Sequence, residues 1–131
     1  MSHWQNFDFE NRIRKILSKV TYASEPNHHL NRPFMTAYQI AIKFNSLYPK
    51  VADTMGYKVG GAGINQNVSL SQYIARELSQ RIKSGEIVDI EGAFLSNLYI
   101  KELTFNNDNE SLKSSLVGTN SDHSIFRLIT P

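Results

Sequence analysis

The chain contains no cysteine among its 131 residues. A protein without cysteine has no disulfide bond, no thiolate nucleophile and no zinc site built on cysteine. Hydrophobic residues make up 40% of the chain and charged residues 20%, which is far from the composition of a disordered protein. This length is enough for one hydrophobic core and too short for two, so we expect a single domain.

Long apolar runs are also missing. No stretch reaches the roughly 18 apolar residues of a transmembrane helix. The segment 1–10 lacks a basic start followed by an apolar run, which is the pattern of an export signal. We therefore expect a cytoplasmic protein that does not associate with membranes.

Motifs for catalysis, metals and cofactors are absent as well. The four histidines stand at positions 3, 28, 29 and 123, and no pair has the helical i, i+4 spacing of a metal site. No Gly-x-Ser-x-Gly elbow supports acyl transfer. We expect no catalytic residue, no metal site and no cofactor. A small enzyme is a third hypothesis, which would require His or Glu side chains converging in a deep pocket with shifted pKa values.

A Gly-rich segment, residues 56–67, precedes the best-defined helix. Gly60 and Gly63 do not match the glycine spacing of dinucleotide-binding folds, and no Gly-Lys-Ser/Thr ending follows. The segment has three interpretations: a phosphate-binding loop, a loop that needs positive φ or close backbone packing, and a loop that contacts the phosphate backbone of a nucleic acid through Lys58.

Basic residues are concentrated in one part of the chain. Residues 11–83 hold eleven Lys or Arg and three acids, whereas residues 84–131 hold three bases and seven acids. Such an asymmetry favours an electropositive surface that faces a polyanion. The alternative is that solvated helices simply carry Lys and Arg.

Helical signals occupy the first two thirds of the chain. Apolar residues recur at helical spacing, and Thr36 and Ser69 are typical N-cap residues, with Gln72 completing a capping box at Ser69. Pro49 can open a short helix that Gly56 closes. The helices are expected at about 6–20, 36–47, 49–55 and 69–83.

β-type patterns follow Gly85. Residues 87–90 and 98–105 are rich in β-branched and aromatic side chains, which predicts two strands of a hairpin. The polar composition of residues 106–131 predicts a mobile tail with a short strand at 124–129. The predicted fold is therefore α+β but mainly helical, a winged-helix-like helix bundle with a C-terminal β-hairpin and a globular part at 1–105.

The order of elements over residues 36–105, helix, short helix, capped helix and hairpin, resembles the winged-helix family of helix-turn-helix DNA-binding domains, with the unit at 34–105. The resemblance implies a small transcription regulator that binds double-stranded DNA, as a homodimer in some members, with helix 69–83 in the major groove. In that arrangement, Gln72, Arg76 and Gln80 would read bases. Lys58, Arg81 and Lys83 would contact phosphates. The basic strip of the first helix, formed by Arg12, Lys15 and Lys19, would add an attraction that does not depend on the DNA sequence.

A protein-interaction module, such as an inhibitor, immunity or adaptor protein without catalytic activity, is the main alternative. The predicted hairpin carries the acids Glu86, Asp89 and Glu91, which would repel phosphate. The features that would distinguish this alternative are an exposed apolar patch around Phe94, Leu95 and Leu98 and the loss of a continuous basic face.

Overall fold

The two longest helices begin at the capping residues that the sequence contains. The computed structural model describes residues 2–21, 31–63 and 68–129. Helix α3 (Ala37–Leu47) begins after Thr36 and helix α5 (Leu70–Ser84) after Ser69, and each start carries a complete capping box. Gly85 ends α5 with a φ of 84°, in the left-handed region where glycine is favoured. The predicted bounds of both helices are confirmed to within one residue.

The shorter helices agree with the sequence in part. Helix α4 (Pro49–Met55) has the predicted proline start and ends at Gly56 in the left-handed conformation. The helix predicted at 6–20 is instead two helices, α1 (His3–Asn6) and α2 (Phe9–Ser18). Asp8 separates them because its backbone is left-handed, with a φ of 49°.

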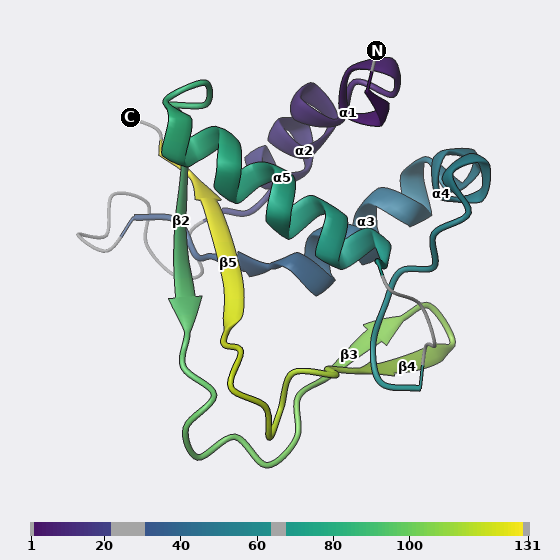
Figure 1. The fold of residues 1–131 in the computed structure, drawn as a ribbon, viewed down its shortest axis with the longest axis vertical. Helices are drawn as coiled ribbons and strands as arrows, with labels where there is room; N and C mark the ends of the chain where they lie inside the picture. The colour runs from purple at the N-terminus through teal and green to yellow at the C-terminus, as the bar shows by residue number, and fades with distance from the viewer. Residues whose placement is uncertain (1, 22–30, 64–67, 130–131) are drawn as a thin grey trace.

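The strands form two antiparallel sheets (Figure 1). In the larger sheet, β5 (His123–Leu128) lies between β1 (Met35–Thr36) and β2 (Ile90–Leu95). In the smaller one, β3 (Thr104–Asn107) pairs with β4 (Glu110–Lys113).

This topology corrects the predicted fold class. The structure is α+β with two sheets, and it is neither mainly helical nor a winged helix, because the strand that follows α5 does not form a hairpin with the next strand. The first strand runs past its expected end at Ile90 to Leu95, and the chain then turns at residues 96–100 instead of continuing as a strand. β2 instead pairs with β5, whose partner residues lie 28 to 38 positions further along the chain.

The C-terminal segment differs from the expected tail at 106–131. It contains β4 and β5, and β5 spans 123–128 where a strand was expected at 124–129. Most of the linker expected at 21–33, and positions 64–67 of the Gly-rich segment, lie outside the described residues.

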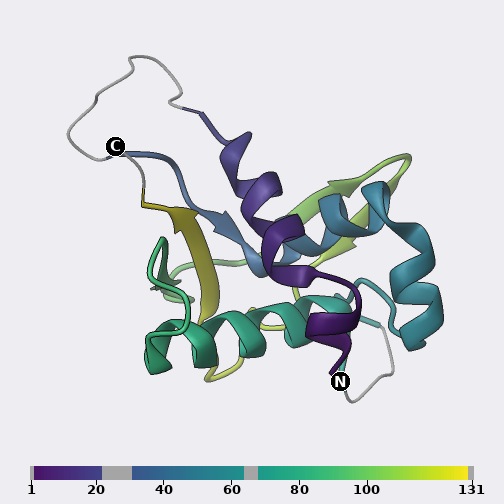
Figure 2. The same ribbon diagram turned by 90° about the horizontal axis from the view of Figure 1, so that it is seen from above.

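One face of the larger sheet packs on the helices, which gather on one side of β5 in Figure 2. Ile90, Phe126 and Leu128 belong to the same buried cluster as Phe9 and Phe44, whose rings stack 4.5 Å apart. Burial of these large apolar groups is the main stabilising term of the fold.

Candidate interaction surface

Exposed apolar side chains are concentrated on β2 and the loop that follows it. Phe94 is 72% exposed, Leu95 39%, Leu98 73% and Tyr99 102%. We call these four residues the apolar edge surface. They lie within six consecutive positions of the chain, with Phe94 and Leu95 on opposite faces of the sheet. Exposed large apolar groups at the edge of a sheet are candidates for contact with other molecules.

β2 is also an edge strand. In the part of the chain that the structure describes, no strand pairs with its outer side (Figure 1). The Asp89 carbonyl accepts a hydrogen bond from the Ile129 N–H at 2.8 Å, on the inner side of the strand. Since backbone groups alternate in direction along an antiparallel strand, Gly92 and Phe94 direct their N–H and C=O groups to the outer side. Unpaired backbone groups of this kind can pair with another strand.

The loop after β2 is held in a fixed conformation by Asn97. Its backbone N–H donates to Asp122 Oδ1 at 2.8 Å, and its side-chain amide donates to the carbonyls of Leu116 and Ser121. Tyr99 has a φ of 64°, an uncommon conformation for a bulky residue. Strained positions of this kind cluster at functional sites.

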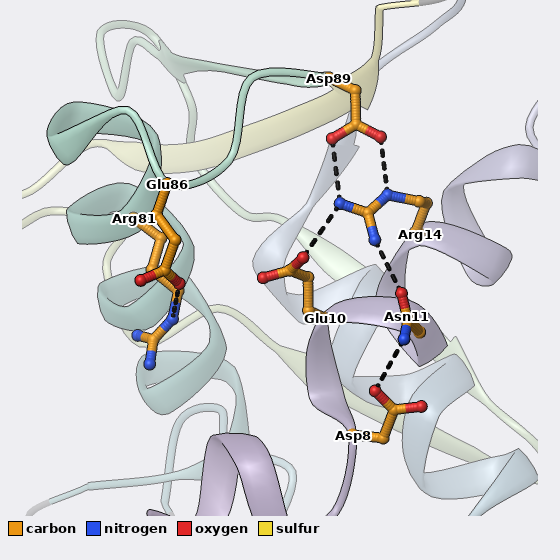
Figure 3. A network of polar contacts seen from close by, with 7 residues as sticks. All are labelled: Asp8, Glu10, Asn11, Arg14, Arg81, Glu86 and Asp89. Atoms are coloured by element: carbon orange, nitrogen blue, oxygen red, sulfur yellow. Dashed lines mark hydrogen bonds and ion pairs between the residues drawn. The ribbon is translucent and has the colours of Figure 1, made fainter.

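Three arginines hold the segment that leads into β2. Arg14 donates to both carboxylate oxygens of Asp89, from Nε at 2.6 Å and from Nη2 at 3.0 Å (Figure 3). This hydrogen bonding lowers the pKa of Asp89 from its ordinary value and raises that of Arg14. In addition, Arg81 lies 2.8 Å from Glu86 and Arg127 lies 2.9 Å from Glu91. The carboxylates of this segment are therefore neutralised within the molecule.

Most of the residues predicted to contact DNA from α5 are exposed in the structure. Gln72, Arg76, Gln80 and Lys83 are exposed along α5. The Gln72 Oε1 already accepts a hydrogen bond from the Ser69 N–H in the capping box, and Arg76 lies 3.8 Å from Glu77.

Arg81 differs from these residues. Only 18% of its side chain is exposed, it donates to Glu77 Oε1 at 2.5 Å, and its guanidinium lies 4.6 Å from the centre of the Trp4 ring. These contacts give Arg81 a role inside the protein. The remaining predicted DNA contacts lie elsewhere. Lys15 is exposed on α2 and Lys19 is exposed directly after its end, Arg12 packs over the Tyr48 ring, and Lys58 is exposed in the loop before α5.

The Gly-rich loop packs closely against its neighbours. Gly60 and Gly61 have φ values of 127° and 107°. A Cβ at Gly60 would lie 2.5 Å from Ser71 Oγ, and one at Gly61 would lie 2.9 Å from the Lys113 carbonyl oxygen. The interpretation of a loop that needs positive φ and close packing is therefore confirmed.

A buried Ser–His pair is the arrangement most similar to a catalytic group. Ser114 Oγ lies 2.6 Å from His123 Nε2, and the two residues are only 8% and 1% exposed. His123 Nδ1 is buried without a hydrogen-bond partner, so no carboxylate orients the ring as in a catalytic triad. The adjacent hollow, lined in part by Tyr38 and Ser71, measures about 50 Å³. We assign this pair a structural role.

Burial of His123 makes stability depend on pH. Burial lowers its pKa from the ordinary value of 6.5, partly offset by the charge of Asp122. The unfolded chain therefore takes up a proton at a higher pH than the folded protein, and the free energy of unfolding falls as the pH drops below about 6.5. Urea denaturation at a series of pH values should show this fall in the wild type and a smaller one in His123→Gln. An unchanged pH dependence in His123→Gln would contradict the assignment.

Sequence reasoning identified three of the four residues of the apolar edge surface and missed Tyr99. Aromatic residues in a segment of β type are normally half-buried, and only the turn at 96–100 places Tyr99 in solvent. A signal was present in Ser96-Asn97, a pair typical of turns.

The described residues contain neither a group suited to a metal ion nor a helix suited to span a membrane. In residues 2–21, 31–63 and 68–129, no three His, Asp or Glu side chains form a group suited to a metal ion. None of the helices in these ranges has the length and apolar character needed to cross a bilayer. No protein-family model, curated protein or solved structure matches this chain.

Proposed function

We propose that this protein is a cytoplasmic protein-interaction module without catalytic activity, which binds a polypeptide through the apolar edge surface. The observation that carries the proposal is the exposure of Phe94, Leu98 and Tyr99 next to the unpaired side of β2. This is the patch expected of an inhibitor, immunity or adaptor protein.

The chemistry of the surface favours a polypeptide as the ligand. Apolar side chains, aromatic ones in particular, are enriched at the buried centres of protein interfaces. The outward N–H and C=O groups of Gly92 and Phe94 need acceptors and donors spaced as in a strand. An extended peptide segment supplies both, as in the addition of a strand to a sheet edge.

The surface is also held in place before binding. The ion pair between Arg14 and Asp89 and the hydrogen bonds of Asn97 fix the two ends of the segment that carries it. Less conformational entropy is then lost on binding, which increases affinity for a given set of contacts.

A photo-crosslinking experiment in cells tests the proposal. A photoactivatable residue at Tyr99 is expected to give a discrete adduct with one polypeptide, and the same residue at Lys50, which is exposed on α4, should give none. The adduct should be lost when Phe94 and Leu98 are changed to serine, because the apolar contacts that hold the polypeptide are removed. No adduct at Tyr99, or the same adduct from both positions, would contradict the proposal.

DNA binding through α5 is a second candidate, supported by the exposed row of Gln72, Arg76, Gln80 and Lys83. Fluorescence anisotropy with a random-sequence duplex across a salt series tests it, with an Arg76→Ala, Gln80→Ala variant for comparison. Affinity that falls steeply with salt and weakens in the variant would support this candidate. No binding at low salt would exclude it.

A further inference from the structure

The outer side of β2 has few of the side chains that normally protect an edge strand. Exposed edges usually carry a charged side chain, particularly lysine, or a proline, which discourage pairing with other strands. β2 contains no proline and one charged side chain, Glu91, which forms an ion pair with Arg127 of the neighbouring strand β5. Residues 92–100 contain neither a charge nor a proline, so this part of the edge carries no charge that would oppose pairing with another strand.

A hollow lies over the face that β2 and β5 turn towards α5. It measures about 290 Å³, lies between the C-terminal half of α5 and the sheet, and has Ile82, Gly92, Phe94 and Phe126 in its lining. Gly92 has no side chain to fill it, and an added Cβ would lie 3.2 Å from the Phe126 ring. Phe94 is exposed two positions further along the same face. Its ring has the size and apolar character needed to fill the corresponding hollow of a second molecule.

The apolar groups are arranged symmetrically about Ala93. Gly92, which borders the hollow, and Phe94 stand one position on either side of it. Val88, which is 78% exposed, and Leu98 stand five positions on either side. Antiparallel pairing of two identical strands centred on Ala93 would place Phe94 of each copy opposite Gly92 of the other, and would bring Val88 towards the second copy's Leu98.

Charge and backbone direction agree with this register. Glu91 would lie opposite the second copy's Leu95, so that no two like charges face each other directly. Gly92 and Phe94, which direct their backbone groups outward, would form the hydrogen-bonded pairs. Opposite residues share a face of the sheet, so the α5 helices of both copies would lie on the same side.

We propose that the polypeptide bound by β2 is a second copy of this chain, paired antiparallel about Ala93 to form one continuous six-stranded sheet. The inference rests on the proposed function and specifies its partner. A symmetric interface of this kind uses the same patch on both copies and closes as a dimer.

Charge substitutions at Ala93 test the register. The side chain is exposed, and in the dimer the two copies of it would lie about 4.5–5.5 Å apart. We expect sedimentation equilibrium to show a concentration-dependent dimer for the wild type. Ala93→Lys and Ala93→Glu should each be monomeric because like charges meet, whereas their equimolar mixture should form a one-to-one dimer. Leu47→Lys, at an exposed apolar position on α3, should dimerise as the wild type.

Two further results separate this inference from the proposed function. Phe94→Ala should raise the dissociation constant of the dimer about tenfold or more, because Phe94 of each copy fills the hollow of the other. A wild type that is monomeric at every concentration, or single variants that dimerise like the wild type, would overturn the dimer. If Tyr99 then still crosslinks to a different protein, the proposed function stands with another partner, and if it crosslinks to nothing, both fail. Circular dichroism and thermal unfolding verify that each variant is folded.

Discussion

Replacing Phe126 by alanine is expected to lower the free energy of unfolding by about 3–5 kcal/mol. Phe126 is 2% exposed and lies in the middle of β5, the central strand of the larger sheet. Its ring covers Gly92 on the neighbouring strand and belongs to the buried cluster that includes Phe9 and Phe44. Truncation removes these contacts and leaves a cavity that the sheet can fill only in part.

Urea denaturation followed by circular dichroism measures this loss. The matched control is Ile129→Ala, which removes an apolar side chain three positions further along the chain, where half of it is exposed. The control should change stability by about 0.5 kcal/mol or less. If Phe126→Ala were as stable as the control, the C-terminal segment would be the loosely attached tail that its composition predicts, and not the centre of the sheet.

The helices could be predicted because their signals are local. A capping box needs only two side chains three positions apart, as at Ser69 and Gln72, and both bonds of that box are present. A glycine that closes a helix acts within one turn, as at Gly56 and Gly85. Interactions over so short a range are unaffected by how the rest of the chain folds.

The strands could not be predicted in the same way because their pairing is not local. A hairpin between neighbouring strands is the simplest assumption after α5, but β2 pairs with a strand that begins at His123. The sequence of β2, Ile-Glu-Gly-Ala-Phe-Leu, has no regular alternation of apolar and polar residues that would mark its buried face. A short strand was expected at 124–129, but nothing in its sequence indicates that β5 lies at the centre of the sheet, between β1 and β2.

The sequence shows that the apolar edge surface is apolar, but it does not show that these side chains are exposed. Apolar residues in a strand are more often buried than exposed, and only the topology shows that β2 is at the edge of the sheet. The roles of the charged residues were equally hidden. Glu86 and Asp89 suggested an acidic wing that would repel DNA, whereas each of them meets an arginine of the same chain.

The second large effect is expected at Arg81, where sequence and structure assign different roles. As a phosphate contact, Arg81 could be replaced without loss of stability. In the structure its Nη1 donates to Glu77 Oε1 at 2.5 Å, and its Nε lies 2.8 Å from Glu86 in an ion pair whose angle does not make a hydrogen bond. The guanidinium also packs over the buried ring of Trp4.

Arg81→Met is therefore expected to destabilise the fold by about 2–3 kcal/mol, because Glu77, of which only 16% is exposed, loses its main hydrogen-bond donor. Arg76, at 3.8 Å from Glu77, is too distant to replace that donor fully. Lys83→Met, two positions further on the exposed face of α5, is the control and should be nearly neutral.

A double-mutant cycle with Glu77→Gln separates the ion pair from the packing on Trp4. The two single changes should not add, because each removes the same interaction, and the coupling energy should be about 1 kcal/mol or more. Additive effects would mean that Arg81 acts through Trp4 and Glu86 alone. Equal stability of Arg81→Met and Lys83→Met would contradict the structural role, and Arg81 would again be a candidate for binding phosphate.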